Sequence, residues 1–122
     1  MANTTVHVTT IALNTSTANP AGTAIVAADT HVITPTKATS KVLLRITNTT
    51  ASTKIATILA GDNPPADAAG QGSLAVSLTD GSTTPQTAYV VVEGSRFLQN
   101  DGSIQITVAS GMTGNIEAIQ LP

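Results

Sequence analysis

The stretch Ile104-Gln-Ile-Thr-Val-Ala-Ser-Gly-Met-Thr-Gly-Asn-Ile-Glu-Ala-Ile-Gln-Leu121 carries the clearest structural pattern in this chain. Its side chains at 104, 106 and 108 are apolar and alternate with polar ones at 105 and 107, the period of a strand with one buried face. Gly111 and Gly114 bracket a turn. We therefore expect short strands over 103–109 and 115–121.

The same alternation recurs upstream and predicts an all-β fold. It is strongest in Lys41-Val-Leu-Leu-Arg-Ile-Thr47, where Val42, Leu44 and Ile46 share one face. Residues 54–60 follow a polar turn at 48–52 and are predicted to return as the second arm of a hairpin. Further strands are expected at 24–26, 31–33, 74–78, 87–93 and 96–99. We predict a single-domain β-sandwich over 23–122, with about eight to nine short antiparallel strands.

Two segments do not fit this regular spacing. Residues 1–22 have little apolar content, so we expect an edge strand or an extended arm that ends at the turn Asn19-Pro-Ala-Gly22. Residues 61–72 contain a proline pair and several glycines and form the longest irregular segment, with at most a helical turn at 65–70.

The composition excludes several classes of function. Charged residues make up 10% of the chain, against about 25% in typical domains. The net charge of −2 gives no basic surface, so neither nucleic acid nor a membrane is an expected partner. Cysteine is absent, which removes disulfides and thiolate chemistry. The first residues lack the features of a signal peptide, so synthesis in a cytoplasm is expected.

Candidate chemical groups are few. Asp29 and His31 are two residues apart, but no nucleophile motif accompanies them, and a polar turn explains the pair. His7 and His31 are the only histidines, so a metal site would need copies related by a threefold axis. Asn100-Asp-Gly102 has the composition of a turn rather than of a calcium loop. We expect no enzyme activity, no cofactor and no metal.

Four segments resemble small β-rich structural proteins of tailed bacteriophages, the nearest group being head decoration (cement) proteins. They are Val42-Leu-Leu-Arg-Ile-Thr-Asn-Thr-Thr50, Ala60-Gly-Asp-Asn-Pro-Pro65, Ser95-Arg-Phe-Leu-Gln-Asn-Asp-Gly-Ser-Ile104 and Gly114-Asn-Ile-Glu-Ala-Ile-Gln-Leu-Pro122. The resemblance covers roughly residues 40–122. It implies a jelly-roll or related sandwich that binds an assembled capsid, commonly as a homotrimer. The family has no fixed binding-residue signature, so no residue role is transferred.

The function expected from this resemblance is a virion structural protein on the capsid surface, which bridges neighbouring copies of the major capsid protein. The N-terminal arm, about residues 2–18, is predicted to reach the adjacent subunit. The expected interface residues are Thr4, Val6, Val8, Ile11, Leu13 and Arg96.

Phe97 beside Arg96 fits either an interface hot spot or the core, and the scarcity of aromatic residues favours the core. Two alternatives to capsid decoration remain. One is a phage tail, baseplate or fibre module. The other is a bacterial surface or carbohydrate-binding module, which would need a signal peptide and an exposed aromatic platform.

Overall fold

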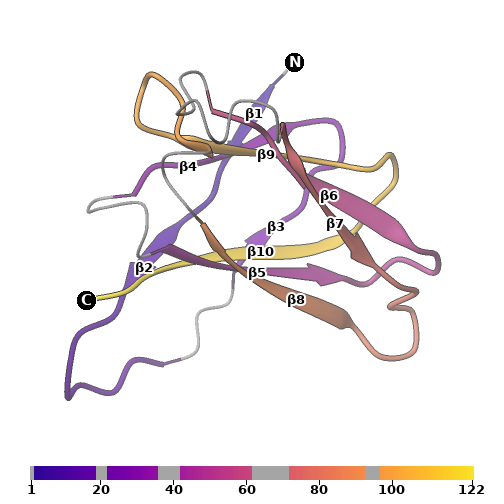
Figure 1. Ribbon diagram of the computed structural model, residues 1–122. Helices are drawn as coiled ribbons and strands as arrows, with labels where there is room; N and C mark the ends of the chain where they lie inside the picture. The colour runs from indigo at the N-terminus through magenta and orange to yellow at the C-terminus, as the bar shows by residue number, and fades with distance from the viewer. Residues whose placement is uncertain (1, 19–21, 36–41, 62–71, 93–96) are drawn as a thin grey trace.

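The computed structural model describes residues 2–18, 22–35, 42–61, 72–92 and 97–122. Their strands form two mixed sheets (Figure 1). Sheet A has the order β1-β4-β9-β6-β7 and contains β1 (Asn3–Thr5), β4 (Thr30–Ile33), β9 (Ile104–Val108), β6 (Lys54–Ile58) and β7 (Leu74–Leu78). Sheet B has the order β2-β10-β5-β8 and contains β2 (Val8–Thr10), β10 (Gly114–Gln120), β5 (Val42–Asn48) and β8 (Gln86–Val92), with β3 (Thr23–Ala24) also paired to β10.

The core lies between the two sheets. Residues of β5 alternate between buried and partly buried, and the predicted inward triplet of Val42, Leu44 and Ile46 is confirmed, because all three are fully buried. On β9 the predicted inward residues Ile104 and Ile106 are likewise fully buried. Apolar side chains from both sheets therefore form one cluster, which defines an all-β protein with the arrangement of a β-sandwich.

The predicted hairpin between residues 41–47 and 54–60 is wrong. β5 pairs with β10 and β8 in sheet B, whereas β6 pairs with β7 and β9 in sheet A. The turn between them carries the chain from one sheet to the other. Alternation along a strand shows which face is buried but not which strand lies beside it, so sequence proximity was the wrong guide.

The N-terminal segment contributes an edge strand to each sheet. β1 pairs with β4 in sheet A, and β2 pairs with β10 in sheet B. Between them the Val6 N–H donates to the Val32 carbonyl (2.9 Å), and the Val6 side chain lies in the core. Both pairings are parallel, which contradicts the expectation of antiparallel strands alone. A segment that crosses between sheets is not held to the antiparallel direction that a hairpin turn imposes.

The strand inventory also differs in detail. The described residues contain ten strands rather than eight or nine, because three short ones lie within the first 24 residues. Phe97–Gln99 do not form the strand predicted at 96–99. Phe97 is nevertheless buried in the core, as the scarcity of aromatic residues in the chain indicated. The irregular segment predicted at 61–72, including its helical turn, lies almost entirely outside the described residues. Among the described residues no helix is long and apolar enough to cross a membrane.

Candidate functional site

The outward-facing side of sheet B carries a row of four side chains across its four main strands, and the three on β10, β5 and β8 are apolar. The strand register places Thr9 of β2 opposite Ile119 of β10, Ile119 opposite Leu43 of β5, and Leu43 opposite Val91 of β8. Residues paired in this way have Cβ atoms about 5 Å apart, so the four side chains are neighbours. We call Thr9, Ile119, Leu43 and Val91 the apolar row. Val91 is 61% exposed, so the row is accessible at the β8 end.

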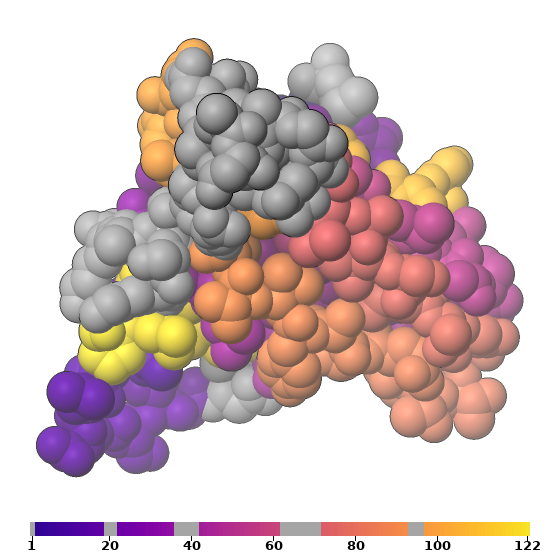
Figure 2. All heavy atoms as spheres, viewed as in Figure 1, coloured from indigo at the N-terminus to yellow at the C-terminus, as the bar shows by residue number. Residues whose placement is uncertain are grey.

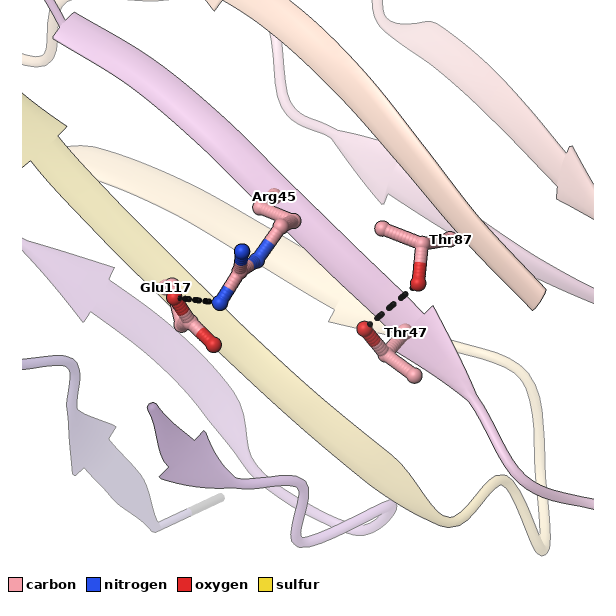
Figure 3. A network of polar contacts seen from close by, with 4 residues as sticks. All are labelled: Arg45, Thr47, Thr87 and Glu117. Carbon is pink, nitrogen blue, oxygen red and sulfur yellow. Dashed lines mark hydrogen bonds and ion pairs between the residues drawn. The ribbon is translucent and has the colours of Figure 1, made fainter. Parts of the chain in front are cut away.

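An ion pair lies directly beside the apolar row. Arg45 of β5 is opposite both Glu117 of β10 and Tyr89 of β8, and its guanidinium donates to the Glu117 carboxylate (Figure 3). This hydrogen bond raises the pKa of Arg45 above its already high value, so the side chain remains charged. Tyr89 is 63% exposed beside the pair. The central charges of this face are therefore satisfied by one another.

Beyond the ion pair the outer face of sheet B becomes hydroxyl-rich. Thr47 of β5 and Thr87 of β8 are opposite each other, and their hydroxyl oxygens are 3.0 Å apart (Figure 3). The face thus changes along the strands from apolar side chains, through one ion pair, to threonines. Such a surface suits contact with another protein surface of low charge.

An open apolar pocket of about 310 Å³ lies at the β2 end of the apolar row. The segment after β2 is held against the sheet, because the Ile11 N–H donates to the Gln120 carbonyl (3.0 Å). The pocket is lined by residues 17–18 together with Thr9, Ile11, Leu43, Ile119 and Leu121. Its size is enough for an apolar side chain from a partner.

Every charged side chain in the described part of the chain has an internal partner. Besides the Arg45–Glu117 pair, Lys54 donates to the Ser110 carbonyl (2.8 Å), and Asp29 accepts from the Thr4 hydroxyl (2.7 Å). The exposed Asp80 and Asp101 accept from Ser82 and Ser103 respectively, and these hydrogen bonds lower the pKa of each carboxyl. These charges close turns and strands rather than forming a site. Asp101 supports the predicted turn at 100–102, where Gly102 has φ of 84°.

The Asp29 and His31 side chains have separate structural partners. His31 is fully buried in sheet A, and its Nε2 accepts the Val26 N–H (3.1 Å). Burial lowers the pKa of His31, and the nearby Ile106 backbone and Asp29 oppose this effect only in part. A fully buried imidazole cannot meet its symmetry copies, so the threefold metal site considered for His31 is excluded. Among the described residues no three His, Asp or Glu side chains gather where a metal could bind.

The structure places the five described residues of the predicted interface in different surroundings. Val6 lies in the core, Val8 is partly buried against it, and Thr4 is held by Asp29. Ile11 lines the apolar pocket, and Leu13 is 75% exposed on the segment that follows. Arg96 lies outside the described residues.

None of the four residues of the apolar row was predicted from the sequence. Ile11, which was predicted, lies in the adjoining pocket. The signal for the apolar row was present in the runs Val42-Leu-Leu44 and Val90-Val-Val92. Three consecutive apolar residues in a strand place at least one apolar side chain on the outward face. The inward-facing alternation in the same strands is the stronger pattern, so the outward-facing apolar residues were not recognised.

The fold and face together define an all-β protein with an accessible, low-charge surface on one sheet. Searches against protein-family models, curated proteins and solved structures found no match for this chain.

Proposed function

We propose that this protein is a structural component of a phage virion that binds the outside of the capsid and holds neighbouring major capsid subunits together. The observation that carries the proposal is the outer face of sheet B, with its apolar row, its internally neutralised ion pair and its adjoining pocket. Binding by this face needs no catalytic group or cofactor.

The finer fold within this proposal is a jelly roll. Strands β3 to β10 pair in a nested way: β3 with β10, β4 with β9, β5 with β8 and β6 with β7, each pair antiparallel. A long hairpin of eight strands, rolled up on itself, gives this order and leaves four strands in each sheet. Jelly rolls of eight strands occur among viral capsid proteins and lectins. The nested pairing therefore supports both the fold and a place in a virion.

The energetics suit a binder that acts in many copies. Complete burial of an exposed Val, Leu or Ile side chain contributes about 1.5–3 kcal/mol. The apolar row supplies less than that for each residue, because Leu43 and Ile119 are already partly buried. One copy would bind modestly, and many copies on a shell would together oppose the separation of its subunits.

The exposed Tyr89 on the same face also suits an alternative function, that of a carbohydrate-binding module. Tyr89 is exposed on sheet B, and sugar rings stack on aromatic faces. Tyr89 is the only tyrosine of the chain, and the single phenylalanine, Phe97, is buried. A platform of several aromatic rings cannot be formed from these residues, so capsid binding is the better-supported function.

The test is co-sedimentation with empty shells assembled from the major capsid protein encoded in the same genome. We expect saturable binding by the wild-type chain. Leu43→Lys places a charge in the middle of the apolar row and is expected to abolish it. Ile55→Lys is the matched control, because Ile55 is an apolar side chain, 45% exposed, on the other sheet. Absence of wild-type binding, or equal loss in both variants, would contradict the proposal.

A further inference from the structure

We propose that β8 pairs with β8 of a second copy of this chain, antiparallel across a twofold axis, so that sheet B continues from one copy into the next. The proposal concerns a contact between copies and does not depend on capsid binding. It uses the free edge of sheet B, whereas capsid binding uses its outer face.

The first observation is that β8 is an open edge. All seven residues from Gln86 to Val92 pair with β5 on one side, and no described strand pairs with them on the other. The strand contains no proline and no charged residue. Proteins usually protect a free edge with lysine, proline, a bulge or a short strand, because its unpaired N–H and C=O groups otherwise accept another strand. β8 has none of these protections.

The second observation is that the core is incompletely covered beside this edge. Ala88 and Val90 of β8, with Leu74 and Val76 of the adjoining β7, pack against the core but are only partly buried. Val42 and Leu44, one strand further in, are fully buried. β7 and β8 lie side by side on the face shown in Figure 2. A strand added to β8 would cover apolar side chains that the single chain leaves accessible.

The composition of the edge is compatible with a second copy as the occupant. Two identical strands pair antiparallel about their middle residue, which here is Tyr89, and this places Thr87 opposite Val91 of the second copy. No charged side chain would face another across the axis, because β8 has none and the nearest pair, Arg45 and Glu117, neutralises itself. The edge thus matches a second copy of itself in direction and length, and no charge on β8 opposes the pairing.

The contact is expected to be weak in dilute solution. A strand of seven residues is about 23 Å long, and a single added strand buries less area than a standard protein interface of about 800 Å² per partner. Pairing would therefore become prominent at high concentration or where copies are held close together. It is a twofold contact, and it differs from the trimer implied by the family resemblance.

Sedimentation velocity over about 1 μM to 1 mM, the range in which weak complexes form, tests the proposal. We expect the wild-type chain to dimerise with rising concentration. Tyr89→Lys and Tyr89→Glu each place like charges at the axis and are expected to weaken dimerisation about ten-fold or more. An equimolar mixture of the two variants should restore it, since opposite charges then meet. Interference optics are needed, because the variants lack the only tyrosine.

Ile55→Lys is again the matched control, since it adds a charge to an exposed strand position away from β8. Far-UV circular dichroism of each variant shows whether the fold is retained. A wild-type chain that stays monomeric, or forms trimers, overturns the proposal. Dimerisation that persists unchanged in Tyr89→Lys also overturns it. Slower amide exchange within Gln86–Val92 at high concentration would locate the contact on β8 directly.

Discussion

Replacing Asn48 with alanine tests what joins the two sheets. Asn48 ends β5 in sheet B and is fully buried. Its side-chain amide donates to the carbonyls of Ser52 (3.2 Å) and Thr79 (2.8 Å), and its Oδ1 accepts the Thr50 N–H (2.9 Å). One side chain thus fixes both the turn that leaves sheet B and the loop that returns after β7. In Asn48→Ala all three bonds are lost.

The expected cost is large for one residue. An intramolecular hydrogen bond contributes about 1 kcal/mol, and buried groups left without a partner cost at least as much. Three such bonds give a loss of about 3 kcal/mol in the free energy of unfolding. The contact from the Asn48 amide to the Leu78 carbonyl, at 3.4 Å, is too long to add much. The unfolding entropy of a chain of 122 residues is about 0.26 kcal/mol/K. The melting temperature should therefore fall by about 12 °C.

Thermal and urea unfolding followed by far-UV circular dichroism measures this loss, because the chain has no tryptophan for fluorescence. Thr87→Ala is the control: it removes an exposed hydroxyl contact with Thr47, which water replaces, and should cost less than about 0.5 kcal/mol. If Asn48→Ala costs no more than Thr87→Ala, the amide does not join the sheets as described.

Three further outcomes follow from individual contacts. Gly81→Ala would place a Cβ atom 1.8 Å from the Asn48 carbonyl oxygen, so a loss of about 3 kcal/mol or more is expected in a melt, and a neutral substitution would contradict the close approach. The pKa of His31 is lowered in the folded chain, so below pH 6.5, the ordinary pKa of histidine, the unfolded chain takes up the proton first. The urea midpoint should therefore decrease as the pH falls below 6.5. His31→Gln should flatten that part of the pH profile. Arg45→Ala leaves the carboxylate of Glu117, 7% exposed, without its cation, and is expected to cost about 2 kcal/mol by calorimetry, between the values for exposed and buried pairs. Adding Glu117→Gln to the Arg45→Ala variant removes the unpaired charge and should recover part of the lost free energy of unfolding.

The sequence predicted local structure better than it predicted neighbours. Alternation in Val42–Ile46 and Ile104–Val108 identified strands and their buried faces, because side-chain direction is set by the backbone within one strand. Strand pairing depends on contacts between distant residues, and the joining role of Asn48 cannot be read from a polar turn of ordinary composition. The apolar row had the same difficulty, because Leu43 and Ile119 become neighbours only through the β5–β10 register.

The distribution of charge on the outer face of sheet B determines how that face can recognise a partner. Its ion pair, Arg45 with Glu117, is neutral as a unit, so the described residues of this face leave no unpaired charge that would steer an approaching charged surface. Association without steering is comparatively slow, with rate constants of about 10⁵–10⁶ M⁻¹s⁻¹. The apolar row and the hydroxyls of Thr47 and Thr87 act only at contact, where shape decides the fit. Such a surface gains most when many copies meet a repeating partner, because each bound copy then needs only a modest affinity. A regular protein shell is a partner of that kind, and an uncharged β8 edge would allow neighbouring copies to pair once the shell has brought them together.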